Sequence, residues 1–163
     1  MQAVVFQVGA ERFAIDTTSI TEVIPCIPAR PVPAAPKALV GVIEYRGAVV
    51  PVLDLCRLFE VGDCPVRLSS RILVCDLDAS GVRWGGDAAD RPLLGVLAEN
   101  VTRVTTLDPE APGSHPGPST EGFSGLGRIF RDGDGLLQLV EVNDLIPAEV
   151  LAAVVRDAGS SAS

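Results

Sequence analysis

Aromatic residues are scarce in this chain, and histidine is almost absent. Aromatics make up 4% of the 163 residues, and His115 is the single histidine. A core with so few aromatics has to be built from Val, Leu, Ile and Ala, which favours strands over an aromatic-lined ligand cavity. A catalytic histidine needs an orienting partner and a positioned substrate, whereas His115 lies in the proline-rich run PGSHPGPS. We interpret His115 as a surface residue, so neither acid–base catalysis nor histidine phosphotransfer is expected of this chain.

The chain also lacks positive charge and long apolar runs. Its formal charge is −8, which removes the electrostatic attraction that dominates nucleic-acid affinity, so no nucleic-acid partner is expected. No apolar run reaches the roughly 18 residues that cross a bilayer, and direct membrane insertion is not expected. The opening MQAVVFQVGAERF has no basic start before an apolar stretch. A secretory signal is therefore not indicated, and we expect a cytoplasmic protein.

Metal, redox and nucleotide motifs are missing as well. The four cysteines contain no C-x-x-C pair: Cys26, Cys56, Cys64 and Cys75. We interpret them as small, buried apolar side chains in a reducing compartment. The run DGDG at 132–135 lacks the closing Glu of a calcium loop and fits a hairpin turn. No phosphate-binding glycine motif is present either. The expected set of cofactors, metals and catalytic residues is therefore empty.

Strand patterns fill the first half of the chain. Residues 4–8 and 12–15 predict a hairpin, and residues 41–45 and 48–53 predict a second hairpin with a tight turn at Arg46-Gly47. Asp54 follows directly and can cap a short helix. Five prolines between positions 25 and 36 exclude a helix and a central strand there. We expect that stretch to form an extended edge or a surface connection.

The second half repeats the pattern. Strands are predicted at 71–77 and 93–107, and a hairpin is predicted across the turn at 131–135. Asn143 or Asp144 then opens a predicted C-terminal helix, and residues 156–163 form a flexible tail. Two Gly-, Pro-, Ser- and Asp-rich stretches separate these elements as loops, and the first of them contains the lone Trp84.

The repetition can be aligned residue by residue. A shift of 81 positions places FAIDTTSITEVIPCIP over LGVLAENVTRVTTLDP, and a shift of 90 places VPVLDL over VEVNDL. The second shift pairs Asp54 with Asp144 at equivalent strand ends, so each is interpreted as a structural cap and not as half of a catalytic carboxylate pair. Two copies are too few for an open array. Two small curled sheets packed together would hide their edges better.

The charges between positions 30 and 57 have a local positive excess. Four cations outnumber two acids there: Arg30, Lys37, Arg46 and Arg57 against Glu44 and Asp54. Two interpretations stay open for this excess. It can be an ordinary solvated surface, or it can meet an acidic partner.

Residues 41–55, GVIEYRGAVVPVLDL, carry the most specific pattern. They resemble the G-x-x-x-x-R-G-x-x-x-P-x-x-D-L hairpin of the chemotaxis coupling (CheW-like) family, and further blocks between residues 2 and 150 agree with that family in order. The resemblance implies a mainly β fold of two pseudo-symmetric five-stranded SH3-like β-barrel subdomains, with short helices and a C-terminal helix. It implies a non-catalytic adaptor that joins the cytoplasmic tip of a chemoreceptor to the regulatory domain of a CheA-type histidine kinase in a receptor array.

The resemblance also implies binding residues. Arg46 and Gly47 match the R-G turn, while Ile20, Glu22 and Val23 match the neighbouring receptor-facing segment. A guanidinium at a tight turn can bind a carboxylate or carbonyl groups, and apolar side chains beside it can receive a receptor helix. The alternative is that Ile20 and Val23 are core residues and Arg46 is a solvated loop charge.

One departure concerns residue 44. The family often has Asn where Glu44 stands, so a negative charge next to the R-G turn is expected to alter which receptor is accepted.

The expected organisation is a single domain over residues 1–155, with approximate subdomains 1–66 and 67–150. Two other functions remain open. One is a small β-barrel enzyme or ligand-binding domain, which would need a polar concave site. The other is the detached regulatory domain of a histidine kinase, which would have the same fold. Self-association into rings is a further possibility that the sequence leaves open.

Overall fold

The structure is a computed structural model that describes all residues except 62–67, 78–92, 112–113, 116–124 and 146–163. Its strands in chain order are β1 (Gln2–Val8), β2 (Glu11–Asp16), β3 (Ile20–Pro25), β4 (Leu39–Tyr45), β5 (Ala48–Asp54), β6 (Arg71–Asp76), β7 (Leu93–Thr106), β8 (Leu126–Asp132) and β9 (Gly135–Val140). The described residues also form three short helical segments: η1 (Thr17–Ser19), α1 (Leu55–Leu58) and η3 (Val142–Asp144).

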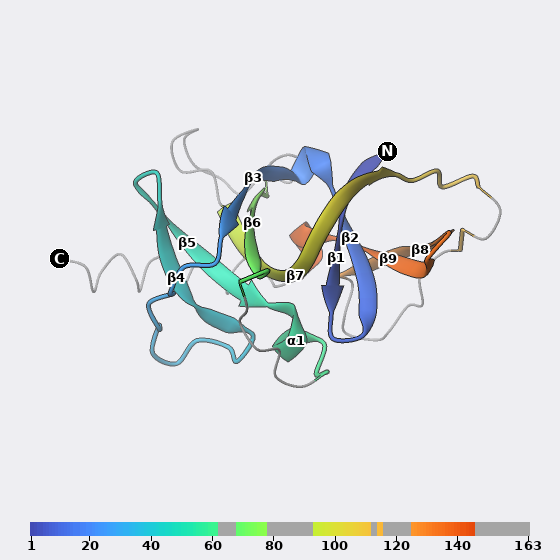
Figure 1. The fold of residues 1–163 in the computed structure, drawn as a ribbon. Helices are drawn as coiled ribbons and strands as arrows, with labels where there is room; N and C mark the ends of the chain where they lie inside the picture. Colours follow the sequence, from blue (N-terminus) through green and yellow to red (C-terminus); the bar gives the residue numbers. More distant parts are fainter. Residues whose placement is uncertain (62–67, 78–92, 112–113, 116–124, 146–163) are drawn as a thin grey trace.

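The strands form two five-stranded sheets that share β7 (Figure 1). One sheet contains β1, β2, β8 and β9, and the other contains β3, β4, β5 and β6. The first half of β7 pairs with β5 and β6, while its second half pairs with β1. Each sheet therefore takes strands from both halves of the chain.

The crossover within β7 has a local cause. Asn100 adopts a φ of 46°, which Asn tolerates better than most residues, and the pairing with β1 shifts register between Val5 and Gln7. The Asn100 side-chain amide also donates to Gln7 Oε1 at 2.5 Å. The bend turns the strand from one sheet into the other.

The duplication seen in the sequence explains this topology. The 81-residue shift places β2 over the first half of β7, η1 over the bend at Asn100, and β3 over the second half. The pairings correspond as well, because β2 lies parallel to β9 just as the first half of β7 lies parallel to β5. The two copies are thus interleaved about a pseudo-two-fold relation.

The predicted fold is confirmed as mainly β with two five-stranded sheets. The described backbone pairings leave both sheets open at their edge strands, so the ladders do not close into complete barrels. The predicted C-terminal helix, the tail at 156–163 and Trp84 lie outside the described residues. The domain boundaries stay predictions.

Aliphatic side chains make up most of the core, as the composition indicates. The largest buried cluster draws Phe6 and Ile15 from one sheet and Leu53, Leu73 and Val96 from the other, all of them almost fully buried. Burial of a Val, Leu or Ile side chain contributes roughly 1.5–3 kcal/mol. This shared cluster therefore joins the two sheets into one body.

One expectation about the cysteines is wrong. Cys56 is disulfide-bonded, whereas we expected reduced thiols throughout. Cys26 and Cys75 are free, and Cys75 is buried as predicted, with burial raising its pKa to about 12. Cys26 is only half-buried, and burial raises the pKa of its thiol too.

Gly41 in β4 predicts a measurable stability effect. An added Cβ at this position would lie 2.2 Å from the Arg30 carbonyl oxygen, and the φ of +155° further disfavours a side chain. We expect Gly41→Ala to lower the free energy of unfolding by about 2–4 kcal/mol because backbone has to move. Urea unfolding followed by circular dichroism measures the change. Gly133→Ala is the matched control, because an added Cβ there has no neighbour within 4 Å. Equal stability of the two variants would contradict the prediction.

Candidate protein-binding face at the β4–β5 hairpin

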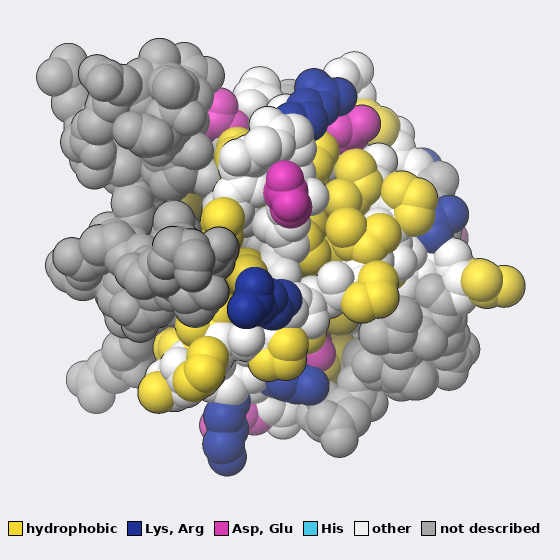
Figure 2. Space-filling view, turned by 90° about the vertical axis from the view of Figure 1, so that its left-hand side faces the viewer, with side chains coloured by type: hydrophobic (Ala, Val, Ile, Leu, Met, Phe, Trp, Pro, Cys, Tyr) yellow, Lys and Arg dark blue, Asp and Glu magenta, His cyan; other side chains and the backbone are white. Residues whose placement is uncertain are grey.

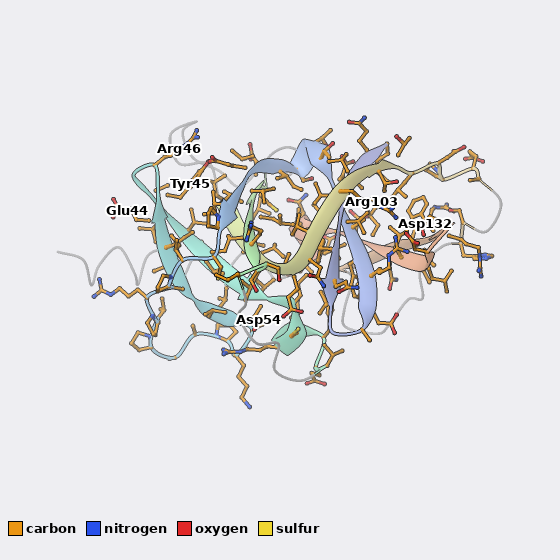
Figure 3. The ribbon with its side chains drawn as sticks, in the orientation of Figure 1. Glu44, Tyr45, Arg46, Asp54, Arg103 and Asp132 are labelled. Atoms are coloured by element: carbon orange, nitrogen blue, oxygen red, sulfur yellow. The ribbon has the colours of Figure 1, made fainter. Side chains whose placement is uncertain are left out.

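The β4–β5 hairpin ends in a two-residue turn. Tyr45 pairs with Ala48, so Arg46 and Gly47 are the only turn residues. Their φ angles are 48° and 81°, and positive values at both positions are the pattern of a type I′ turn, whose twist matches that of the flanking strands. Gly47 suits this geometry because it has no Cβ. The predicted tight turn is confirmed, and it holds Arg46 at the outermost point of the hairpin (Figure 3).

Arg46 is held by two neighbours. Its Nη2 lies 3.2 Å from Glu22 Oε2 of β3, and its guanidinium carbon lies 5.3 Å from the centre of the Tyr45 ring. The Tyr45 hydroxyl donates a hydrogen bond to the same Glu22 oxygen. Glu22 of β3 therefore contacts both Tyr45 and Arg46 of the hairpin, and these contacts fix the direction of the Arg46 side chain.

This cluster is exposed. The Arg46 side chain is 72% accessible and that of Glu22 is 39% accessible. Exposed ion pairs typically contribute about 0–1 kcal/mol. We conclude that the pair orients the guanidinium and adds little to stability. Glu44 lies beside it, exposed and without an ion pair among the described residues, and Figure 3 shows its side chain pointing away from Tyr45.

β3 has two different faces. Its residues alternate between half-buried and exposed along the whole strand. Ile20 and Ile24 pack against core clusters, and Glu22 lies on their side of the strand. Val23 points to the opposite side and is 41% exposed. Of the five residues suggested by the resemblance, Glu22, Arg46 and Gly47 thus form an ionic surface at the hairpin turn, Val23 is exposed on the other side of β3, and Ile20 packs against the core.

Sequence reasoning missed two residues of this region. Tyr45 connects Glu22 to Arg46, yet strand alternation marked it only as a residue of the hairpin. It is the single tyrosine of the chain and directly precedes the R-G pair, which was the available signal. Ile27 is 42% exposed just beyond β3, and its place among prolines concealed its apolar contribution to the surface.

Of the two predicted caps, the structure shows one. Asp54 is buried at the N-terminus of α1 and accepts a hydrogen bond from the Cys56 backbone N–H at 2.9 Å. It also lies 3.5 Å from Arg57. Asp144 is the last residue of η3, and its own N–H donates to the Glu141 carbonyl. Any helix after it lies outside the described residues, so its capping role stays a prediction.

The acidic turn of the β8–β9 hairpin serves a structural purpose. Arg12 donates two hydrogen bonds to Asp132, at 2.8 and 2.6 Å, and Arg103 reaches both Asp132 and Asp134. The Arg12 hydrogen bonds lower the pKa of Asp132 to about 2. Among the described residues no cluster of three metal-ligating side chains occurs.

His115 pairs with β8 through its backbone. It exchanges two hydrogen bonds of 2.8 Å with Ile129, and its side chain is exposed. This agrees with the interpretation of His115 as a surface residue.

Known proteins share this architecture. A family model described as the CheW-like domain matches residues 2–150. The chain belongs to the CheW-like domain family. It is 23% identical to the chemotaxis protein CheW of Treponema pallidum strain Nichols, over 92% of this chain and 84% of that protein. It is 33% identical to protein FrzA of Myxococcus xanthus, over 56% of this chain and 71% of FrzA.

A solved structure agrees with the fold. The scaffolding protein TtCheW from Thermoanaerobacter tengcongensis superposes with a TM-score of 0.74 at 21% identity, over 90% of this chain and 87% of that one. The resemblance stated from the sequence is confirmed, and this CheW-like protein is a non-catalytic adaptor that couples receptors to CheA in chemotaxis. No helix among its described residues is long and apolar enough to cross a membrane.

The tyrosine contact gives a direct spectroscopic prediction. Its hydrogen bond to Glu22 raises the pKa of Tyr45. We expect Glu22→Gln to lower that pKa toward the ordinary value near 10, because the negative acceptor is gone. Ultraviolet absorbance of tyrosinate during a pH titration reports on this residue alone, since the chain has one Tyr. Asp134→Asn, at the other hairpin, should leave the titration unchanged. An identical titration curve for Glu22→Gln and wild type would refute the contact.

The Arg12–Asp132 pair predicts a pH-dependent contribution to stability. Because the folded pKa of Asp132 lies below its ordinary value near 4, the stabilisation is present above that value and is lost as the pH falls through about 2. Arg12→Gln should lower the free energy of unfolding by about 1–2 kcal/mol at neutral pH and by much less near pH 2. Urea unfolding at both pH values measures this, with Arg131→Gln as control. An equal loss at both pH values would show that packing, not charge, is responsible.

Proposed function

We propose that this CheW-like adaptor binds its partners through the β4–β5 hairpin turn and the adjoining face of β3. The proposal rests on one observation: the Arg46 side chain is exposed and is held in a fixed direction by Glu22. A two-residue turn places its guanidinium at the tip of the hairpin, and among the described residues its only ion pair is with Glu22. A guanidinium has five N–H donors, so most of its hydrogen-bonding capacity remains for a partner carboxylate or carbonyl.

Apolar surface next to the charge supports the same assignment. Val23 and Ile27 are both more than 40% exposed, and Figure 2, which views the end of the molecule that carries β4 and β5, shows hydrophobic side chains gathered beside charged ones. Arginine is one of the residue types that are enriched among binding hot spots. An amphipathic helix could lay its apolar stripe over Val23 and Ile27 and direct a polar group to Arg46.

The partners follow from the family. We infer that the cytoplasmic tip of a helical chemoreceptor and the regulatory domain of the CheA-type kinase are the bound parts. The adaptor would then reside in the cytoplasm at receptor arrays. Ile20 belongs to this proposal as support, because its packing against the core fixes the start of β3. Self-association into rings stays a prediction.

Glu44 adds selectivity to this face. Its exposed carboxylate gives the hairpin a second, negative contact point beside the positive one. Like charges placed opposite each other weaken association, so an acidic residue at the corresponding position of a receptor would be disfavoured. We infer that a receptor bound here carries a neutral or basic residue opposite Glu44.

Removal of the guanidinium tests the proposal. Arg46→Ala should weaken binding to a purified receptor cytoplasmic fragment, or to the CheA-type kinase, by roughly 5–100-fold, since oriented arginines are frequent binding hot spots. Arg46→Lys should recover part of the affinity, because the charge is kept and the planar donor set is lost. Isothermal titration calorimetry measures both.

The matched control is Arg131→Ala, which removes an exposed arginine at the far hairpin. Circular dichroism first establishes that each variant is folded. Unchanged affinity of Arg46→Ala for both partners, with Arg131→Ala behaving like wild type, would remove the hairpin face from the binding surface and leave the family's role intact.

A further inference from the structure

The proline-rich segment between β3 and β4 has a regular burial pattern. From residue 26 to residue 38 every third side chain is turned inward and the two between are exposed. The inward residues are Cys26, Ala29, Val32, Ala35 and Ala38. The segment includes two turns, in which the Ala35 N–H donates to the Val32 carbonyl and the Leu39 N–H donates to the Pro36 carbonyl. We call residues 26–38 the strap.

The strap is anchored to the protein. Arg30 exchanges two backbone hydrogen bonds of 2.8 Å with Val42 of β4. Val32 and Ala35 pack against the main core cluster, and Ala29 packs against the cluster under β4 and β5. A segment that is already anchored loses little conformational entropy when a partner binds it. The exposed face of the strap is therefore a preformed surface.

That exposed face is positively charged. Residues 23–43 contain Arg30 and Lys37 and no Asp or Glu, although the whole chain has 21 acidic residues and a net charge of −8. Both side chains are exposed, and neither has an ion-pair partner among the residues that the structure describes. In Figure 2, Lys and Arg side chains lie among hydrophobic ones on the lower part of the face. Two uncompensated cations on an acidic protein form a site that favours an anionic partner.

A cleft lies beside the strap. It has a volume of about 540 Å³ and separates the strap from α1 and the start of β4. Val32, Ala35 and Leu39 contribute apolar walls, while Lys37 and Arg57 contribute cations. The size is within the range of pockets that bind side chains or small ligands.

The polar groups of the cleft carry both signs of charge. Arg57 lies 3.5 Å from the Asp54 carboxylate and donates to the Lys37 carbonyl at 3.4 Å, so its charge is largely balanced. Glu60 also lines the cleft, and no ion pair connects it with Lys37 in the described part of the chain. Within the described ranges, Lys37 and Glu60 are each without an ion pair at the cleft, and Arg30 is without one farther along the strap.

We propose that the strap and its cleft form a second docking surface, and that its occupant is an extended acidic segment of a partner protein. Carboxylates of that segment bind Arg30 and Lys37, and one of its apolar side chains enters the cleft. The strap leads into the end of β4 that lies away from the hairpin turn (Figure 1), and it shares only Ile27 with the hairpin face. The inference does not depend on the partners proposed for the hairpin face.

A labelled synthetic peptide of alternating Glu and Leu tests the surface. We expect saturable binding by fluorescence anisotropy, weaker at higher ionic strength, with amide chemical-shift changes confined to the strap, α1 and the start of β4. The double variant Arg30→Glu/Lys37→Glu should weaken binding roughly tenfold or more, because two attractive contacts become repulsive. Lys37→Gln alone should have a smaller effect in the same direction.

Three controls make the experiment decisive. Arg131→Glu makes a similar change at a distant exposed arginine and should leave peptide binding unchanged. A peptide with Gln in place of Glu should bind much more weakly, and free glutarate should not compete at equal concentration. Failure of the acidic peptide to bind, equal binding of the Gln peptide, equal competition by glutarate, or an equal loss in Arg131→Glu would each overturn the proposal.

Discussion

The whole architecture depends on the backbone hydrogen bonds of β7. This strand is 14 residues long, well above the usual strand length of 5–6 residues, and its two halves belong to different sheets. The bend at Asn100 lets one continuous strand pair with β5 and β6 before it and with β1 after it. Because both sheets share this strand and one core cluster, they cannot separate without exposing buried aliphatic side chains. The hairpins at the two ends of the molecule are thereby held at a fixed separation.

The two hairpin turns show how duplicated elements diverged. At the β4–β5 turn, the acidic residue Glu22 of β3 forms an ion pair with the basic turn residue Arg46. At the β8–β9 turn the charges are reversed, because the basic residue Arg103 of β7 forms ion pairs with the acidic residues Asp132 and Asp134. The 81-residue shift pairs Glu22 with Arg103 directly. The second turn is further stabilised by the two short hydrogen bonds from Arg12, whereas the arginine of the first turn stays largely exposed. Similar backbone positions thus carry a stabilising contact in one copy and an accessible charge in the other.

Local sequence rules predicted the elements better than the contacts between them. The R-G pair predicted the tight turn because few residues accept positive φ at both positions, and Asp54 predicted the α1 cap because a side-chain oxygen two residues before Cys56 can accept its free N–H. The link from Tyr45 to Glu22 joins residues 23 positions apart, and no local rule brings them together. The disulfide at Cys56 was missed for a similar reason, since irregular cysteine spacing contains no information on which thiols meet in space.

The sequence by itself determined the strand-rich class, the duplication, the family and the turn that carries Arg46. Each of these depends on short-range patterns: strand alternation, turn chemistry and an ordered set of motifs. Only the tertiary structure decided which strands share a sheet, that β7 belongs to both, that Glu22 reaches Tyr45 and Arg46, and that Lys37 has no ion pair with any described residue at the cleft. Those features depend on long-range pairing and on the direction in which each side chain leaves the backbone, and residues distant in the sequence settle both.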